Sequence, residues 1–288
     1  MHFDHVVIIG TSLLYSVSLL VVAALGLALA FGMMRVVNMA HGELLMLGAY
    51  VSITLVHAGL GFWLTVPVAA LAVGLLGMAV ERLILRRLYG RIWATMLATW
   101  GLSLLLVGAV QFFFGTTTEG IANPLGTVKV GDYTVSAYNL VMIGAAVVMI
   151  VATYLLFHRT PFGATARAAA ALPEMASALG VNVARTNMIS FGVAAALAGL
   201  GGALLAPVSG VGPSFGQGYI GRAFMTVVVG GASPLLGTTS AAALLGGVNA
   251  GVSNLAGPVL GTVALLLVSM LVLRFLPTGL TGLWRRSR

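Results

Sequence analysis

The sequence contains no cysteine, a single lysine and few charged residues of either sign. Asp, Glu, Lys and Arg make up 7% of its 288 residues. Without cysteine, disulfide bonds and thiolate metal sites are excluded. The lysine, Lys129, stands between two valines, so the Walker A phosphate-binding motif, which needs a lysine after a glycine-rich loop, is excluded as well. Energy from ATP would therefore have to come from another chain.

Histidine-based metal chemistry has little support either. The sequence holds no His-Glu-x-x-His zinc motif, and its five histidines are scattered, at positions 2, 5, 41, 57 and 158. We therefore predict that this chain is not an enzyme and that it binds no metal or cofactor itself.

Apolar residues are what the sequence has in abundance. Hydrophobic residues make up 60% of the chain and its mean hydropathy is +1.09, far above the range of soluble domains. Apolar runs of roughly 20 residues follow one another, and each is long enough to cross the hydrocarbon layer as a helix. We predict an all-α, polytopic membrane helical bundle that forms one transmembrane domain over residues 1–288.

Arginine placement predicts the orientation, because basic residues that flank membrane spans stay in the cytoplasm. Arginines cluster between residues 82 and 91, between residues 159 and 185, and at Arg274, Arg285, Arg286 and Arg288. These regions are expected inside, and segment 115–137 outside. The N-terminus is then predicted outside and the C-terminus in the cytoplasm. The first apolar run, 6–31, is too long for a signal peptide and is expected to remain as a span.

Full-length crossings are predicted at residues 6–31, 36–57, 62–81, 92–114, 138–157, 186–206, 235–256 and 259–276. An odd number is needed to bring the C-terminus inside. The short run 223–231 is therefore predicted to be a broken or tilted ninth crossing, which is tolerated where the backbone faces protein or water. Eight crossings are the alternative.

Two shorter patterns predict packing and a turn. Small residues recur every fourth position, which favours close helix contacts; they are Ala195, Gly199 and Ala203 in one run and Ala242, Gly246 and Ala250 in another. Valines alternate around Gly131-Asp132 between residues 128 and 135, which predicts a β-hairpin in the outer segment.

Residues 159–185 form a polar island between two spans. Within it, Pro173 suits the first turn of a helix and Glu174 suits its positive N-terminal end, while Gly180 can end it in a left-handed conformation. We predict a short helix over residues 173–179, through which a partner could push on both flanking spans. The alternative is an ordinary cytoplasmic loop that happens to be helical.

A polar cluster opens the second predicted span. It consists of Arg35, Asn38, His41 and Glu43. On a helix, Arg35, Asn38 and Gly42 would share one face, with Glu43 pointing elsewhere. Ionisable groups in a membrane segment are costly, which favours a polar constriction or intracellular gate. The alternative is a purely structural role, in which Glu43 pairs with an arginine of another span and His41 is a hydrogen-bonded packing residue.

Several motifs resemble one known family. They are G-A-T-A-R-A-A-A-A-L-P-E-M-A-S-A-L-G-V-N at 163–182, V-N-M-A-H-G-E-L-L-M-L-G-A-Y at 37–50, V-V-V-G-G at 227–231 and L-P-T-G-L at 276–280. Together they are similar to the permease subunits of the branched-chain amino acid and urea family of ABC importers. The resemblance covers nearly the whole chain.

The resemblance implies that the island docks into a groove of a separate ATPase subunit. The matching positions are Gly163, Arg167, Ala168, Glu174, Ala176, Gly180 and Asn182. One departure is Leu172, which stands where relatives usually carry a polar residue. Because leucine is a poor N-cap, the start of the short helix is expected to fray until the partner binds.

The resemblance also implies a location and partners. The chain is expected in the bacterial plasma (inner) membrane, paired with a second homologous permease subunit or with itself. Two ATPase subunits would hold ATP and Mg, and an extracytoplasmic binding protein would deliver the solute. No nucleic acid partner is expected. Transport would proceed by alternating access.

The solute is predicted with a lean toward urea or a short amide, because L-A-T-W-G-L-S-L at 97–104 and V-G-P-S-F-G-Q-G-Y-I at 211–220 look more like urea permeases. Branched-chain or other amino acids are the alternative. The candidate path or gate residues are Asn38, His41, Glu43, Thr99, Trp100, Gln217 and Tyr219, with Trp100 either narrowing the path or filling a buried position. An ATP-independent facilitator channel or secondary transporter is the rival of another class, and a membrane scaffold is a third.

Overall fold

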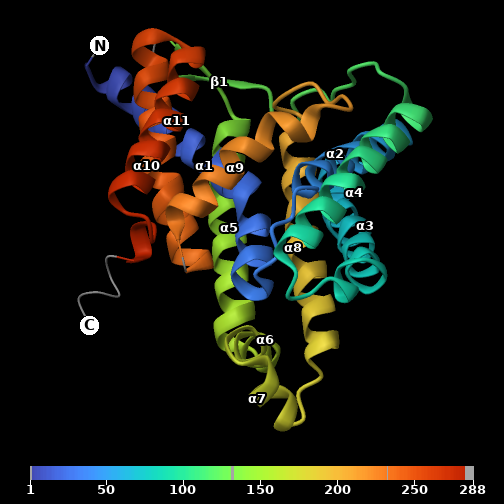
Figure 1. Ribbon diagram of the computed structural model, residues 1–288. Coiled ribbons are helices and arrows are strands. Elements are labelled where there is room, and N and C mark those ends of the chain that lie inside the picture. Colours follow the sequence, from blue (N-terminus) through green and yellow to red (C-terminus); the bar gives the residue numbers. More distant parts are fainter. Residues whose placement is uncertain (1, 131–132, 232, 283–288) are drawn as a thin grey trace.

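The computed structural model describes residues 2–130, 133–231 and 233–282 (Figure 1). Within these ranges the chain is a bundle of α-helices with one small hairpin, so the predicted all-α membrane bundle is confirmed. The helices are α1 (His2–Met34), α2 (His41–His57), α3 (Phe62–Leu83), α4 (Ile92–Phe114), α5 (Tyr138–Arg159), α6 (Pro161–Ala171), α7 (Pro173–Ala178), α8 (Val183–Leu205), α9 (Phe215–Gly230), α10 (Pro234–Ala256) and α11 (Pro258–Phe275). A 3₁₀ turn, η1 (Leu85–Arg87), follows α3.

Seven helical segments of the described chain are long and apolar enough to cross a membrane. They are Val7–Met34, Phe62–Arg87, Ile92–Phe114, Tyr138–Arg159, Val183–Leu205, Pro234–Ala256 and Pro258–Gly282. The remaining two helices of the bundle, α2 and α9, have 17 and 16 residues. At about 1.5 Å per residue, each is shorter than a hydrocarbon layer of about 30 Å. The count of nine crossings, predicted with 36–57 as a full crossing and 223–231 as the broken or tilted one, stays a prediction.

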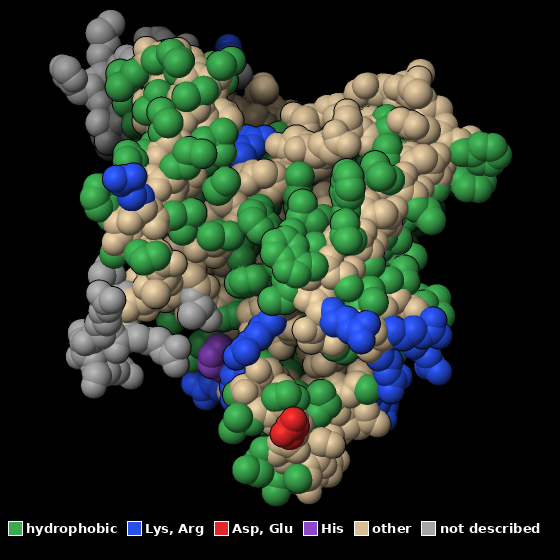
Figure 2. Space-filling view, viewed as in Figure 1, with side chains coloured by type: hydrophobic (Ala, Val, Ile, Leu, Met, Phe, Trp, Pro, Cys, Tyr) green, Lys and Arg blue, Asp and Glu red, His purple; other side chains and the backbone are tan. Residues whose placement is uncertain are grey.

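The two ends of the bundle differ in character. Figure 1 shows the beginning of α1 and the hairpin at one end, and α6 and α7 at the other. At the first end, an isolated bridge between Glu119 and Val211 joins two connections that the sequence places outside. Figure 2 shows Lys and Arg side chains gathered where the bundle meets α6 and α7. This agrees with the predicted sidedness, although the arginines at 285, 286 and 288 lie outside the described residues.

Helices α1 and α8 form the centre of the bundle. In each of them, 67% of the most apolar stretch is buried, against 17% in the segment that contains α11. α8 packs against α1, α2 and α3, and α1 packs against α5, α9 and α10. The outer helices therefore surround a two-helix core, and their remaining apolar surface is free to face lipid.

Glycines allow the backbones around α8 to approach one another closely. A Cβ atom on Gly202 would lie 1.8 Å from the carbonyl oxygen of Leu45 in α2, and one on Gly48 would lie 2.2 Å from that of Gly199. In α10, a Cβ on Gly246 would lie 2.7 Å from the Cα of Val17. The predicted small-residue stripes are thus confirmed as packing surfaces, of α8 on α2 and α3 and of α10 on α1.

The predicted hairpin is confirmed. Strands β1 (Thr127–Val130) and β2 (Tyr133–Ser136) are antiparallel, with Lys129 opposite Thr134. The side-chain amide of Asn123 donates hydrogen bonds to Ser136 Oγ (2.9 Å) and to the carbonyl oxygen of Gly126 (3.2 Å), which ties the hairpin's base together. The expected turn residues, 131 and 132, lie outside the described residues.

The second crossing differs from the prediction of a helix over 36–57. Arg35 takes a left-handed conformation (φ 52°) and ends α1, residues 36–38 have no helical structure, and α2 begins only at His41. The helical face expected to hold Arg35, Asn38 and Gly42 therefore does not form. This segment is apolar enough to look helical, but its backbone finds partners on other helices instead.

The crossing near residue 223 also differs from the prediction. α9 is an unbroken helix that begins eight residues earlier, at Phe215, and the break follows it at Gly231 (φ 82°). A Cβ on Gly231 would lie 2.5 Å from the carbonyl oxygen of Thr278, and Thr281 donates a hydrogen bond to the Gly230 carbonyl oxygen (2.8 Å). The break is therefore held by the segment after α11, and it lies at the end of the helix rather than within it.

The close contact at Gly202 yields a stability prediction. Replacing Gly202 with Ala forces α8 away from Leu45, and we expect the loss in stability to be about 1–3 kcal/mol, as for other overpacked cores. Gly108→Ala is the matched control, because a Cβ there meets no atom within 4 Å. The midpoint of thermal unfolding in detergent should fall for Gly202→Ala alone. Equal midpoints for the two variants would contradict this packing.

Candidate functional site

The non-helical segment between α1 and α2 lies inside the bundle and folds back along α1. His41, at its end, places Nε2 2.9 Å from the carbonyl oxygen of Ala23, near the middle of α1. Non-helical backbone at such depth needs hydrogen-bond partners, because lipid offers none. The segment predicted as the second crossing is therefore a non-helical stretch followed by a short helix, and it is the more deeply interrupted of the two irregular crossings.

Two of the predicted path residues, Asn38 and Thr99, supply those partners, and a third, His41, bonds α1 instead. Asn38 Oδ1 accepts a hydrogen bond from the Ala40 amide (3.1 Å), and Thr99 Oγ1, from α4, accepts one from the Met39 amide (3.1 Å). Because a carbonyl oxygen only accepts, His41 donates its Nε2–H to Ala23. Asn38, His41 and Thr99 are all buried. This geometry favours the structural alternative for His41, a hydrogen-bonded packing residue, and gives Asn38 and Thr99 the same kind of role.

Glu43 behaves differently from its neighbours. It is 3% exposed in the first turn of α2, and its Oε2 has no hydrogen-bond partner. The arginine expected to pair with it is not found within the described residues, where the ion pair observed joins His57 and Glu119 (3.8 Å). The positive end of the α2 dipole favours a carboxylate there. Glu43 therefore keeps hydrogen-bonding capacity that the fold does not use.

The first turns of α2 and α9 meet. A Cβ on Gly42 would lie 2.6 Å from the carbonyl oxygen of Gly216, and one on Gly216 would lie 2.2 Å from that of Gly42. Two helix N-termini, each with positive partial charge, thus converge beside buried Glu43. Such junctions of partial helices are where transporters commonly build their solute sites.

A hollow lies beside the start of α9. It measures ≈ 350 Å³ and is lined by Val107, Gln111, Thr116, Pro213, Ser214 and Gln217. Gln217, a predicted path residue, is thus exposed to it. Tyr219 faces another way, since its hydroxyl lies 2.9 Å from Ser209 Oγ. Trp100 is 56% exposed on α4, so the expectation of a buried packing position for it is wrong.

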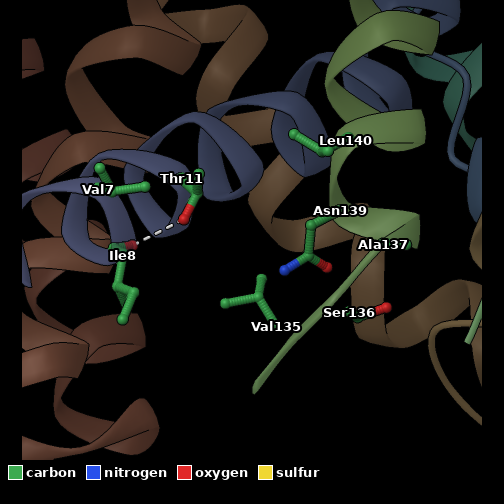
Figure 3. Close-up of a pocket in the computed structure, with 8 residues that line it drawn as sticks. All are labelled: Val7, Ile8, Thr11, Val135, Ser136, Ala137, Asn139 and Leu140. Carbon is green, nitrogen blue, oxygen red and sulfur yellow. Dashed lines mark hydrogen bonds between the residues drawn. The ribbon is translucent and has the colours of Figure 1, made fainter. Parts of the chain in front are cut away.

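A second, smaller hollow lies at the outer end of α1 (Figure 3). It measures ≈ 70 Å³ between the first turns of α1, strand β2 and the start of α5. Its walls are mainly apolar, and the hydroxyl of Thr11 donates to the carbonyl oxygen of Ile8 (2.9 Å). None of the predicted path residues lines it, so we assign it no part in the site.

The polar island between α5 and α8 contains two helices. Thr160 accepts a hydrogen bond from the Gly163 amide (3.1 Å) and caps α6, which the sequence did not predict. The predicted short helix is confirmed as α7, with Leu172 giving no side-chain cap and Gly180 left-handed (φ 87°). Asn182 then caps α8 by accepting from the Arg185 amide (2.9 Å).

The predicted coupling residues divide into two groups. Gly163 and Ala176 are buried; a Cβ on Gly163 would lie 2.3 Å from the Phe157 carbonyl oxygen, which shows that Gly163 lets α6 turn tightly against α5. The exposed ones are Arg167, Ala168, Glu174, Gly180 and Asn182. The structure therefore separates residues that shape the island from residues that a partner could touch.

An apolar patch on α7 adds to the exposed group. Leu172, Met175 and Leu179 are 64%, 61% and 80% exposed. At 3.6 residues per turn, these positions fall on one side of the helix, whereas Glu174 and Ser177 fall on the other. Three large apolar side chains on a protruding helix are unusual for a free surface and indicate a protein contact.

Sequence reasoning missed Arg222. The crossing was placed at 223–231, so the arginine just before it was left out, although it lies midway along α9 (Phe215–Gly230). Small and polar residues precede Arg222 at helical spacing in an otherwise apolar region, and this pattern could have extended the predicted helix to include it. In the predicted ninth crossing, an arginine is a functional candidate by default.

Sequence reasoning also missed a Gly-x-Ser-x-Gly match, G-P-S-F-G at residues 212–216. In hydrolases this motif is a strand-to-helix turn with a histidine within reach of the serine. Here Ser214 follows an irregular connection, and the histidines whose side chains are described lie elsewhere: His41 on Ala23, His57 beside Glu119 and His158 stacked on Tyr154. The match therefore lacks the context for catalysis.

Comparison with known proteins supports the family resemblance along nearly the whole chain. Residues 9–278 match the protein family described as "Branched-chain amino acid transport system / permease component". A probable branched-chain amino acid transport permease protein LivH of Methanocaldococcus jannaschii is 29% identical, over 98% of this chain and 94% of its own length. The high-affinity branched-chain amino acid transport system permease proteins BraD of Pseudomonas aeruginosa and LivH of Escherichia coli are each 29% identical, over 90% of both chains. No solved structure matches.

The contact between Thr99 and the non-helical segment yields a second stability prediction. Thr99→Val keeps the shape but leaves the part-buried Met39 amide without a partner, which should cost about 1–3 kcal/mol. Thr262→Val is the control, because Thr262 is only partly buried and its hydroxyl bonds within α11. Thermal unfolding in detergent should separate the two variants. A Thr99→Val protein as stable as the control would show that the segment does not depend on α4.

Proposed function

Because the chain belongs to the branched-chain amino acid transport permease family, we propose that it is the membrane-spanning subunit of an ATP-driven importer for branched-chain or similar amino acids. The sequence-based lean toward urea finds no support among the relatives, whose names concern branched-chain amino acid transport. The amino acid alternative therefore replaces it. The chain itself translocates the solute and hydrolyses nothing.

The observation that carries this proposal is the protruding α6–α7 unit. It connects α5 directly to α8, and α8 is the central helix of the bundle. A partner that grips the apolar patch of Leu172, Met175 and Leu179 could therefore move α5 and α8 together. Such a lever has no purpose in a transporter that works alone, but it suits a chain driven by a separate ATPase.

Partners supply what the chain lacks. With its one lysine outside any glycine-rich loop, the chain needs other subunits to bind ATP and Mg. We expect two ATPase subunits, one for each permease subunit, with the exposed residues Arg167, Glu174 and Asn182 around the apolar patch at the contact. The poorly capped start of α7 at Leu172 is expected to become better ordered when the ATPase binds.

A second permease subunit is expected to cover α9. The exposed face of this helix carries Ser214, Gln217 and the backbone of Gly218, and a polar face of this kind is not stable against lipid. Covering it with a second copy or a homologous chain would place the hollow beside Gln217 between two subunits. The solute path would then run along that interface.

The outer end offers a platform for an extracytoplasmic binding protein. The bridge between Glu119 and Val211 and the hairpin of β1 and β2 hold two outer connections in fixed positions. In the proposed cycle, solute released there enters the path while the outer end is open. ATP-driven motion of α7 then closes the outer end and opens the inner one.

The proposal is tested by uptake into proteoliposomes. The permease, copurified with its ATPase and permease partners, is supplied with binding protein and labelled leucine or urea, with and without ATP. Uptake of leucine that requires ATP and binding protein supports the proposal. Urea uptake would restore the original lean, and uptake by an intact complex without ATP would favour the facilitator channel or secondary transporter.

The coupling role of α7 yields a separate prediction. Leu179→Asp places a carboxylate in the apolar patch, and losing such an anchor typically costs about 2 kcal/mol or more, or about 30-fold in affinity. ATPase copurification and ATP-dependent uptake should both fall. Ser177→Asp, on the opposite side of α7 and also exposed, is the control and should retain both. If both variants assemble normally, α7 does not form the contact.

A further inference from the structure

Arg222 lies in the middle of α9 and is only partly buried. Its guanidinium donates one hydrogen bond, from Nη2 to the carbonyl oxygen of Gly218 (3.0 Å), and its Cζ lies 5.4 Å from the centre of the Tyr219 ring. A guanidinium has five N–H donors. The contacts with its own helix therefore hold the group in place and leave most of its donors free.

The charge of Arg222 has no counterpart within the described residues. The acidic side chains described are Glu43, Glu81, Glu119 and Glu174, and the ion pair observed among them is that of Glu119 with His57. A charged side chain on a membrane-crossing helix is costly unless water or an anion accompanies it. In the predicted partial crossing of α9, this positive charge therefore needs an anionic partner.

Open space adjoins the guanidinium on the same face of α9. A Cβ on Gly218 or on Gly221 would meet no atom within 4 Å, and both glycines are exposed. Towards the outer end, Ser214 and Gln217 continue this face into the hollow of ≈ 350 Å³. A polar surface with room above it therefore leads from the hollow to Arg222.

We propose that Arg222 binds the carboxylate of the solute as it passes along α9. This inference rests on the proposed function, because it requires a solute with a carboxylate. The planar guanidinium matches a carboxylate through paired N–H···O bonds, and the glycines leave room for the rest of the solute. A single ion pair beside an aqueous path is also weak enough to release the solute inward, as conduction requires.

The absence of cysteine makes a direct test possible. In Arg222→Cys, the only thiol of this chain replaces the guanidinium, and a cationic reagent (2-aminoethyl methanethiosulfonate) or an anionic one (2-sulfonatoethyl methanethiosulfonate) can then be attached. We expect ATP-dependent leucine uptake by the complex to fall about tenfold or more, as for loss of a charge-assisted hydrogen bond. The cationic reagent should restore part of the uptake, and the anionic reagent should not.

A second readout separates solute binding from a structural role. In a separate variant, Gly221→Cys, Arg222 is kept and the thiol stands beside it on the exposed face of α9. Excess leucine should slow the reaction of this thiol with the cationic reagent, whereas leucinol, which has the same side chain but no carboxylate, should not. Arg274→Cys is the matched control, because Arg274 is exposed in the last turn of α11. Its uptake should be unchanged, and leucine should not protect it.

The outcomes distinguish this inference from the proposed function. If the wild-type complex takes up no amino acid with ATP, the proposed function fails and the inference with it. If the wild type is active and Arg222→Cys is equally active, or leucine and leucinol protect alike, only the inference fails. A third outcome is that the complex with Arg222→Cys does not assemble, whereas the complex with Arg222→Lys assembles but does not select solutes with a carboxylate. Arg222 would then pair with an acid of the second permease, and the inference is overturned.

Discussion

Inside a membrane, every backbone amide and carbonyl must find a partner in the protein, and the rest of this structure depends on how that demand is met at residues 35–40. Most of the chain satisfies it with long helices. Here the chain leaves α1 at Arg35, and Thr99 and Asn38 accept hydrogen bonds from the Met39 and Ala40 amides that a helix would have satisfied, while His41 ties the segment to α1. This arrangement lets α2 begin deep in the bundle, so that its first turn meets that of α9. A polar junction between two helix ends is thereby built within an apolar protein.

Close packing makes the junction rigid. The glycines of α8 bring its backbone into direct contact with α2 and α3, and the contact of Gly42 with Gly216 joins α2 to α9. Because these contacts are between backbones, no side chain can rearrange to absorb a displacement. Movement at one end of α8 is therefore expected to reach the other end. The α6–α7 unit is attached to the end of α8 opposite the outer connections, which is where an external force would be most useful.

Charge is used sparingly and at positions that bear on transport. Basic residues gather near α6 and α7, as Figure 2 shows, and the bundle between the two ends is mostly apolar. Among the described residues, Glu43 has an unpartnered oxygen beside the helix junction, Glu81 has one in α3, and Arg222 has free donors on α9. A zwitterionic amino acid carries a carboxylate, which suits Arg222. In the proposed importer, energy comes from other subunits, so this subunit needs no series of titrating carboxylates to carry protons.

The sequence by itself determined the features that depend on local composition. Hydropathy placed the long helices to within a few residues, Pro173 and Gly180 bounded α7, and alternation around residue 131 indicated the hairpin, because spans, caps and turns need only neighbouring residues. It could not reveal that 35–40 is not helical, since V-V-N-M-A is apolar enough for a helix and its partner Thr99 lies about sixty residues away on α4. It also divided α9 at residue 223, because Gly218, Gly221 and Arg222 are poor helix residues for a membrane when read locally. Only the tertiary structure, by covering one face of α9 with α1, α2 and α10 and leaving the other open, decided that these residues form one helix and one polar surface.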